Sequence, residues 1–380
     1  MKLLLTITGA ITALIGSKSA LAEYTLNMTK GITDISQDIY WLHMMAFWVC
    51  VGIGFVVFGA MFYSIIAHRK SKGAKAAHFH ESTTVEFIWT GIPILILIAM
   101  AIPASKTLVD IEVLDKADMT VKVTGIQWKW QYDYPEEGIS FVSNLAQSSR
   151  DVIKASPEER EAVHNESDYL RSVDNHLVLP VDTTVRFLIT SNDVIHNWWV
   201  PAFGVKQDAN PGFINDAWAK PNEIGTYRGQ CAELCGKDHG FMPIVVEAMP
   251  EAEFDAWYAT KVTSEVVRQE NMSKTFTHDE LMVQGEVIYG TYCSSCHMAN
   301  GEGVPPVFPA IAKSPVALGP RDDHLSLVIN GVSGSAMQAF GKQLDAVQLA
   351  SVVHYQRHAF GNDVGDISQP QDVINLSNGQ

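Results

Sequence analysis

The chain has 380 residues, enough for two or three domains, and a formal net charge of -15 at pH 7. This acidic balance argues against a nucleic-acid-binding protein and is compatible with docking of basic proteins. A mean hydropathy of +0.05 indicates that part of the chain lies in lipid.

Residues 1–22 have the pattern of a secretory signal peptide. A lysine lies near the start, an apolar run too short to span a membrane follows, and small residues precede Glu23. An uncleaved anchor is the alternative. Export would place the later domains outside the cytoplasm.

Two stretches without charged residues, 41–66 and 87–105, can each cross the roughly 30 Å hydrocarbon layer as a helix. We expect helices over about 41–66 and 86–107. The basic residues of segment 68–75 between them should stay cytoplasmic. Residues 23–109 are therefore expected to form an N-terminal segment and a hairpin in a bacterial inner (cell) membrane, with the remaining domains on the periplasmic or extracellular side.

Residues 110–260 are expected to form a β-domain. Alternating apolar, β-branched and aromatic residues after Met119 predict several short strands of a sandwich or small barrel. Residues 145–174 interrupt this pattern as a charged insertion, in which Ser156 and the following Pro-Glu-Glu predict the start of a helix. A docking role and a solvated excursion without function are both open for the insertion.

Sulfur and imidazole side chains gather late in this β-domain. They are Cys231, Cys235, His239 and Met242, with His196 upstream. Thiolate and thioether are soft ligands that select copper, and imidazole suits copper equally well. A single blue-copper ion needs one cysteine, whereas two cysteines four residues apart can bridge two copper ions, each capped by one histidine. We predict a dinuclear copper centre that moves electrons.

Three other interpretations of these residues are open. A structural zinc site would use two cysteines and two histidines but leave Met242 without a role. A disulfide between Cys231 and Cys235 would suit an oxidising compartment. The third is a core cysteine pair with incidental histidines. Gly236 and Gly240 flank the histidine and favour a ligand loop over a packed strand or helix.

A second module follows residues 261–277, which are polar and which we interpret as a linker. Residues 278–361 begin with an amphipathic stretch that ends at the motif Cys-Ser-Ser-Cys-His. This pattern is the attachment signature of a c-type haem. Cys293 and Cys296 would bond the haem, and His297 would bind its iron.

Met337, in a glycine-bounded loop, is the predicted second axial ligand of the haem iron. Methionine and histidine together give the higher potentials that are typical of electron carriers. The alternative ligands are His324, His354 and His358, which we otherwise expect on the surface. Residues 362–380 are expected to form a polar tail.

These parts, in this order, resemble subunit II of a haem-copper cytochrome c oxidase with a cytochrome c domain fused to its C-terminus. The resemblance rests on the membrane hairpin, on Gly-Ile-Gln-Trp-Lys-Trp-Gln-Tyr (125–132), and on the copper and haem motifs. It implies a multi-domain protein with a two-helix transmembrane hairpin, a cupredoxin-like Greek-key β-barrel and an all-α, class I-like cytochrome c domain.

The resemblance also implies how the metal ligands divide. Both cysteines would bridge the two copper ions. His196 and Met242 would complete one ion, and His239 and the backbone carbonyl of Glu233 the other. The side chain of Glu233 would also reach a magnesium ion at the boundary with subunit I.

Two further residues acquire roles from the resemblance. Trp128 matches the aromatic residue through which electrons enter above the copper centre. Glu86 matches a carboxylate near the mouth of a proton path in subunit I. For Glu86, ordinary helix-capping and dipole chemistry beside Thr83 and Thr84 remains open.

The resemblance implies an oxidoreductase component that passes electrons from an external carrier through the haem and the copper pair to subunit I, with proton translocation. The partners would be subunits I and III, the lipid bilayer, and a soluble or membrane-bound cytochrome c as donor. Because a tethered haem has a high effective concentration, that donor could feed either the haem domain or the face near Trp128. A copper-assembly protein and a nitrous oxide reductase-type electron-entry domain are the alternatives. The first would need no haem, and the second needs a separate histidine-rich catalytic domain.

Overall fold

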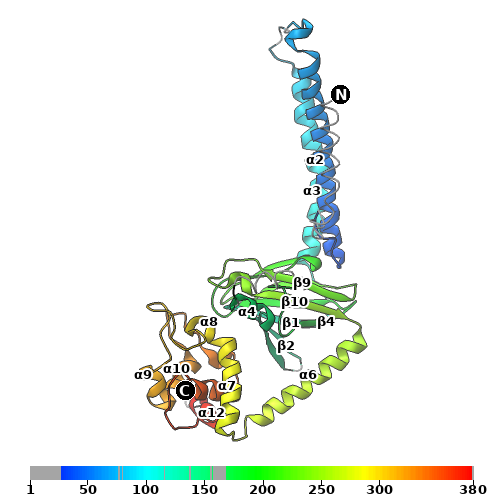
Figure 1. The fold of residues 1–380 in the computed structure, drawn as a ribbon. Helices are drawn as coiled ribbons and strands as arrows, with labels where there is room; N and C mark the ends of the chain where they lie inside the picture. The colour runs from blue at the N-terminus through cyan, green and yellow to red at the C-terminus, as the bar shows by residue number, and fades with distance from the viewer. Residues whose placement is uncertain are drawn as a thin grey trace, which may run out of the picture.

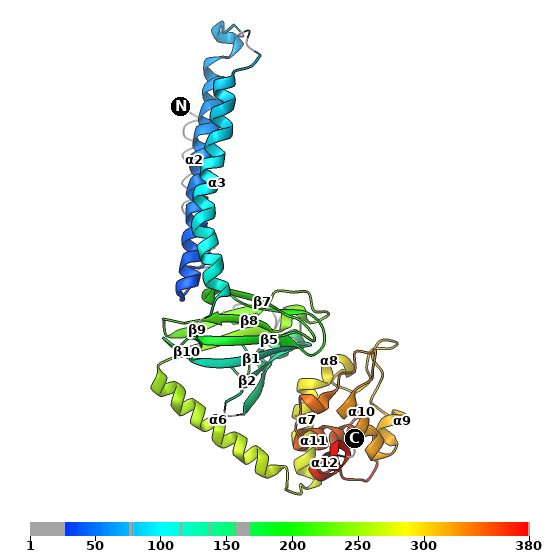
Figure 2. The same ribbon diagram turned by 180° about the vertical axis from the view of Figure 1, so that it is seen from behind.

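The computed structural model describes residues 27–75, 78, 80–114, 116–136, 138–154, 156 and 168–378. A long helical hairpin stands on a β-domain, and one further helix leads from that domain to a helical domain (Figures 1 and 2). The predicted architecture is confirmed. The predicted signal peptide and the body of the helix expected after Ser156 lie outside the described residues.

The first helix of the hairpin, α2 (Asp34–Ala67), is longer than the sequence predicted. It begins at Asp34 rather than near residue 41 because Thr33 forms a capping box with Ser36. The Thr33 hydroxyl also donates to the carbonyl of Phe203, in the short helix η2 (Pro201–Phe203), at 2.9 Å. The helix is thereby tied to the β-domain.

The second helix of the hairpin, α3 (Thr83–Glu112), continues past the predicted end near residue 107. Its last turn is fixed to the β-domain, since the Trp218 indole donates to the carbonyl of Ile111 at 3.1 Å. A short helix, η1 (Lys70–Lys72), lies in the connection between α2 and α3. The most apolar windows of α2 and α3 have mean hydropathies of 2.3 and 2.2 and bury none of their residues within the protein, so both helices could cross a membrane.

In the described residues, two five-stranded sheets face each other, with strand orders β3-β2-β1-β5-β8 and β4-β10-β9-β6-β7. β1 pairs with β5 and β4 with β10 in parallel, and the other pairs are antiparallel. The strands are β1 (Met119–Ile126), β2 (Lys129–Tyr134), β3 (Ile139–Ser143), β4 (Leu177–Pro180), β5 (Val185–Ser191), β6 (His196–Val200), β7 (Val205–Ala209), β8 (Asn215–Ala219), β9 (Gly225–Cys231) and β10 (Pro243–Met249).

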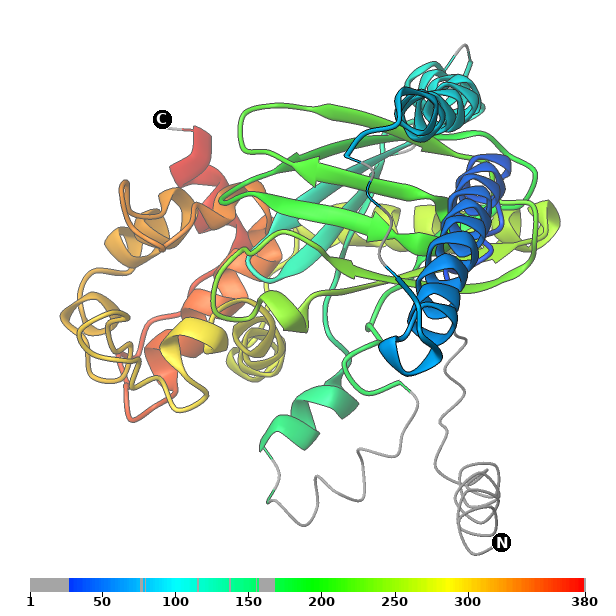
Figure 3. The same cartoon turned by 90° about the horizontal axis from the view of Figure 1, so that it is seen from above.

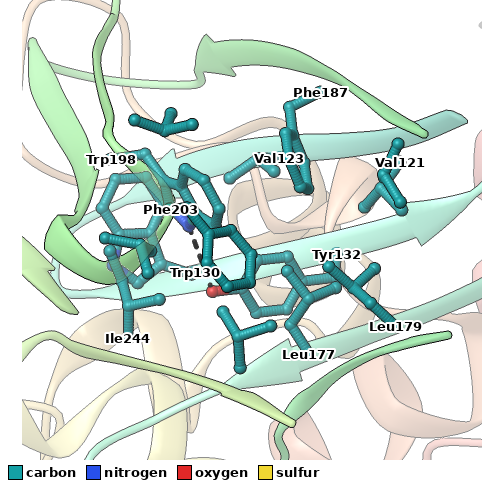
Figure 4. Close-up of a cluster of buried hydrophobic side chains, with 14 of the residues drawn as sticks. Val121, Val123, Trp130, Tyr132, Leu177, Leu179, Phe187, Trp198, Phe203 and Ile244 are labelled. Carbon is teal, nitrogen blue, oxygen red and sulfur yellow. Dashed lines mark hydrogen bonds between the residues drawn. The ribbon is translucent and has the colours of Figure 1, made fainter. Parts of the chain in front are cut away.

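The core of the β-domain lies between the two sheets (Figure 4). Alternate side chains along the strands point into the core, in agreement with the predicted period-two pattern, and several of these side chains are aromatic. Trp130, Tyr132, Phe187 and Trp198 are all fully buried, and the Trp198 indole donates to the Tyr132 hydroxyl at 3.4 Å. Each ring removes roughly 150–250 Å² from water. This packing holds the strands that carry the metal-ligand loops.

The described part of the insertion contains one helix, α4 (Gln147–Lys154). The two ends of the insertion are held together, because the backbone and side-chain amides of Asn144 donate to the Asp174 carboxylate at 2.7 and 3.0 Å. The insertion therefore leaves and re-enters the β-domain at one place.

The segment predicted as a linker is largely helical, a conformation that the sequence analysis did not predict. Helix α6 (Glu251–Asn271) extends through most of residues 261–277. Glu265 accepts hydrogen bonds from Arg268 and Gln269, three and four residues later, and such pairs stabilise an exposed polar helix. Arg268 also bonds Asp345 of the helical domain at 3.0 Å. The connection is thus a helical spacer.

The helical domain is built around two helices, α7 (His278–Tyr292) and α11 (Ala346–His358). They cross at Gly285, where a Cβ atom would lie 2.1 Å from the Ser351 carbonyl oxygen, so only glycine permits this approach. Shorter elements complete the domain: α8 (Ser294–His297), α9 (Pro315–Leu318), α10 (Arg321–Asn330) and η4 (Phe340–Lys342).

Residues 362–380, predicted as a polar tail, include helix α12 (Pro370–Asn378). Val373 is 3% exposed and packs in the apolar core of the helical domain. Before this helix, the Gln369 side chain bonds both the N–H and the carbonyl of Phe276. Arg357, 1% exposed, forms an ion pair with Asp366. The C-terminal segment is part of the domain. Seen from above, this domain lies to one side of the β-domain (Figure 3).

Candidate functional site

Three of the predicted copper ligands converge in the β-domain. His196 begins β6, Cys231 ends β9, and Cys235 lies in the loop that follows. All three are buried, and their ligand atoms lie within 4.8 Å of one another. The two sulfur atoms are 3.8 Å apart, and Nδ1 of His196 is 3.9 Å from Cys231 Sγ.

The other predicted ligands border the same pair of sulfur atoms. His239, in η3 (His239–Phe241), places Nδ1 3.5 Å from Cys235 Sγ. The Met242 sulfur is 3.4 Å from the same atom, and the carbonyl of Glu233 is 3.3 Å from Cys231 Sγ. The structure brings together every donor that the sequence predicted for the centre.

The donor set fits a copper pair better than the other interpretations. Both cysteines are free thiols. With His196, His239, Met242 and the Glu233 carbonyl they make six donor groups, whereas a structural zinc ion takes four. The contact between the two thiols lowers the pKa of Cys231 and raises the pKa of Cys235. Metal binding would displace the protons that the thiols carry.

Asp193 is a functional residue that the sequence reasoning missed. Its Oδ1 accepts a hydrogen bond from Nε2 of His196 at 2.8 Å, which leaves Nδ1 facing the thiols. Burial lowers the pKa of His196, but the bonds to Asp193 and Cys231 outweigh it and raise that pKa. A carboxylate beside a metal-binding imidazole orients the ring. Its position three residues before the histidine was the available signal.

Close packing against Gly125 also fixes the position of the His196 ring. A Cβ atom on Gly125 of β1 would lie 2.7 Å from Cδ2 of the His196 ring. Any larger residue at this point of the predicted motif 125–132 would displace the imidazole.

Trp128, the predicted electron-entry residue, lies against residues 231–242, which carry most of the predicted copper ligands and are called the copper loop below. It is half-buried in the turn between β1 and β2, and its indole N–H donates to the carbonyl of Cys235 at 3.1 Å. The Gln127 amide donates to the same carbonyl at 2.8 Å. Trp130 and Trp198, by contrast, are fully buried in the core.

The predicted haem motif forms a compact turn at the end of α7. Cys293 is buried, whereas Cys296 and His297 are half-buried on α8. Nδ1 of His297 donates to the carbonyl of Pro309 at 2.8 Å, which leaves Nε2 for an iron ion. Burial lowers the pKa of His297 and so keeps the imidazole neutral. These side chains fit a covalent haem.

Met337 lies in the loop between α10 and η4 and packs against the same apolar cluster that contains Cys293. The sequence predicts the alternative ligands on the surface, and this prediction is wrong for two of the three. His324 and His354 are 4% and 0% exposed, because α10 and α11 face the domain core, and His358 is half-buried.

The two carboxylates implied at subunit boundaries are both exposed. Glu86 lies in the first turn of α3, where the N-cap residue Ser82 makes no side-chain capping bond. The Glu233 side chain projects from the copper loop, while its carbonyl faces Cys231.

The copper loop and the haem motif are in direct contact. Lys237, between Cys235 and His239, donates to the carbonyl of Ser295, inside the haem motif, at 3.2 Å. Gln338, next to Met337, donates to Oδ2 of Asp193 at 2.7 Å. Sequence reasoning could not find either contact, because each joins residues of different domains.

Family comparisons divide the chain in the same way as the fold. The model for the transmembrane domain of cytochrome c oxidase subunit II matches residues 22–107, and the model for its periplasmic domain matches residues 119–249. The model described as cytochrome c oxidase, cbb3-type, subunit III matches residues 280–355.

Curated relatives agree with the first two matches. A probable cytochrome c oxidase subunit 2 of Rickettsia conorii is 39% identical over 230 residues, which are 60% of this chain and 69% of the relative. Cytochrome c oxidase subunit 2 of Cereibacter sphaeroides is 36% identical over 231 residues, 59% of this chain and 76% of the relative.

Among solved structures, the periplasmic domain of subunit II of cytochrome oxidase from Bradyrhizobium japonicum is 41% identical, with a TM-score of 0.34. The match covers 40% of this chain and 99% of that one. The family models and the curated relatives show that the chain belongs to the cytochrome c oxidase subunit II family, whose members are components of the haem-copper oxidases, and that it carries a cytochrome c domain after its β-domain.

Proposed function

We propose that this chain accepts electrons from a cytochrome c through a covalent c-type haem and a dinuclear copper centre. It passes them to the oxygen-reducing site in subunit I, coupled to proton translocation. The family implies copper and haem binding and association with subunit I. The contact between the copper loop and the haem motif is the observation that supports the proposed order, in which electrons pass from the haem to the copper pair.

That contact supports transfer within the chain. Gln338 follows the proposed axial ligand Met337 and bonds Asp193, which in turn bonds the proposed copper ligand His196. Two hydrogen bonds on one carboxylate thus join the surroundings of both centres. The bond from Lys237 to Ser295 is a second junction between the two motifs.

The protein's own contribution is to hold both sets of ligands rigidly. We assign Cys231, Cys235, His196 and Met242, with His239 and the Glu233 carbonyl, to two copper ions. Cys293 and Cys296 would hold the haem covalently, with His297 and Met337 on its iron. When bound, these groups supply one-electron transfer. The buried thiols and the strand framework exclude water and limit movement of the ligands between redox states.

Roles at the boundaries belong to the same proposal. Trp128, bonded to the Cys235 carbonyl, is placed to connect a partner surface with the copper loop. The exposed Glu233 side chain would bind magnesium against subunit I, and Glu86 would lie near a proton path there. Subunit III is a further partner, and a soluble or membrane-bound cytochrome c is the donor.

The apolar helices and the transmembrane family match make the chain a membrane protein with extramembrane domains. We place it in the bacterial inner membrane, after removal of the signal peptide 1–22, with the β- and helical domains on the periplasmic side. Rickettsia and Cereibacter relatives support a bacterial membrane. The copper-assembly alternative accounts for neither Met242 nor the haem motif, and the nitrous oxide reductase alternative does not account for the membrane hairpin.

The proposed order is tested by mixing the intact, oxidised oxidase with reduced cytochrome c in the absence of oxygen. The haem absorption should change first, at a rate proportional to donor concentration. The copper absorption should follow at a rate independent of donor concentration. Gln338→Ala and Lys237→Ala should slow only this second phase. Direct reduction of copper, proportional to donor concentration, would show that the donor docks near Trp128 instead.

A further inference from the structure

A cluster of three histidines in the helical domain has no part in the proposed electron path. His278 is the first residue of α7, and His354 and His358 lie one turn apart on α11. One ligand nitrogen from each ring lies within 4.8 Å of those of the other two. Two histidines at i and i+4 share one face of a helix, so this pair can bind one ion.

The distances are close to those of a bound metal. Nδ1 of His278 and Nε2 of His354 are 3.0 Å apart. Nitrogen ligands at about 2.0–2.1 Å from a tetrahedral zinc ion lie roughly 3.3 Å from one another. Nδ1 of His358 donates to the carbonyl of His354 at 2.8 Å, which leaves its Nε2 unprotonated for an ion. Only small side-chain rotations are needed.

The burial of the cluster is graded from inside to outside. His354 is 0% exposed, His358 is half-buried and His278 is exposed, so an ion can enter beside His278. Nε2 of His354 faces Nδ1 of His278, so Nε2 is the nitrogen that would bind the ion.

The electrostatic surroundings favour neutral imidazoles. Burial, followed by the nearness of His358 and His278, lowers the pKa of His354 to about 4. The neighbouring Arg357 is paired with Asp366, so its charge is compensated. Neutral imidazole is the form that binds zinc, copper and nickel.

We propose that His278, His354 and His358 form a binding site for a divalent transition-metal ion, of the zinc and copper class, in the helical domain. α7 has 15 residues and so separates this site by about 20 Å from the haem motif at its other end. The ion would therefore join His278, the first residue of α7, to α11. It would stabilise the domain rather than transfer electrons.

The test uses the full chain, loaded with haem and copper, and Zn²⁺ as the probe. Wild type should retain one more zinc equivalent than His278→Ala or His358→Ala, with unchanged copper and haem spectra. At a hundredfold excess over Kd, zinc should raise the melting temperature of the haem domain by roughly 10 °C. Neither variant should respond. Both replace residues that are not fully buried, so the domain should still fold.

His176→Ala is the matched control, because His176 is a histidine of the β-domain that contacts a single carboxylate, Glu247. This variant should bind zinc as wild type does. Equal zinc retention by wild type and His278→Ala, or no retention by wild type, overturns the proposal and leaves a hydrogen-bonded histidine cluster. The result does not depend on the proposed electron path.

Discussion

Among its hydrogen bonds, the Asp193 carboxylate accepts one from the His196 ring at Oδ1 and one from the Gln338 amide at Oδ2. Asp193→Ala should therefore lower copper affinity about 10–100-fold, the usual effect of losing a carboxylate behind a metal-binding histidine. Competition with a chelator measures this affinity. Gln338→Ala removes the contact with Asp193 and a bond from Gln343 within the helical domain, but it keeps the bond from His196 to Asp193 and should leave copper affinity unchanged. Equal affinity of wild type and Asp193→Ala would contradict the orienting role.

Cys235 is the thiol closest to both His239 and Met242. In the oxidised chain, Cys235→Ser should abolish the multiline electron paramagnetic resonance pattern of one electron shared by two copper nuclei. The haem spectrum should be retained, because the haem ligands lie in another domain. Cys50→Ser, on α2, should change neither signal. Loss of both signals in Cys235→Ser would indicate general unfolding instead.

At the scale of elements, the crossing of α7 and α11 depends on Gly285. Gly285→Ala would place Cβ 2.1 Å from the Ser351 carbonyl oxygen and 2.5 Å from Cβ of Tyr355, both of them atoms that cannot rotate away. Overpacking of this kind costs about 1–3 kcal/mol. Thermal unfolding of the haem domain should show this loss.

Gly290→Ala on the same helix is the matched control. Nothing lies within 4 Å of its Cβ position. Alanine should stabilise the helix there by up to about 1 kcal/mol, because it has the higher helix propensity. If both variants changed stability equally, close packing at Gly285 would not be the cause.

Elements and ligands were predictable from sequence where their determinants are local. The proposed copper and haem ligands lie mostly in short motifs, and the strands follow from alternation in 119–134 and 175–190. Helices α6 and α12 were missed because contacts with other parts of the chain stabilise them. Arg268 of α6 pairs with Asp345, and Val373 of α12 packs in the core of the helical domain. The burial of His354 was missed for the same reason. The bond from Gln338 to Asp193 joins residues far apart in sequence, and no local pattern indicates it.

At the scale of the whole molecule, Lys129 lies at the junction of the two exported domains. It is 3% exposed, and its ammonium group lies 4.2 Å from the centre of the Tyr292 ring of the haem domain. Burial lowers the pKa of Lys129 from 10.5 to about 8. Nearby Asp193, Cys293 and Cys296 raise this pKa, and Arg150 lowers it further. Covalent attachment of a haem would remove the contribution of both cysteines and so would not restore the ordinary value.

Docking of the haem domain should therefore strengthen as pH rises. A hydrated Lys129 in the undocked state keeps its proton up to about pH 10.5, whereas the docked state loses it above about pH 8. Between these values docking releases a proton, so higher pH favours the docked state. Below pH 8 the penalty for burying the charge is present in full, and above 10.5 it is absent.

Neutron scattering from the full chain, with the detergent contrast-matched, measures the docked fraction. Wild type should become more compact between pH 8 and 10.5. Lys129→Met has no charge to bury, so it should be docked to a greater extent at pH 8 and change little with pH. The difference between the two proteins isolates Lys129 from other groups that titrate in this range. A parallel response of both proteins would show that Lys129 does not control docking, and that the contacts of Lys237 and Gln338 set the arrangement of the domains.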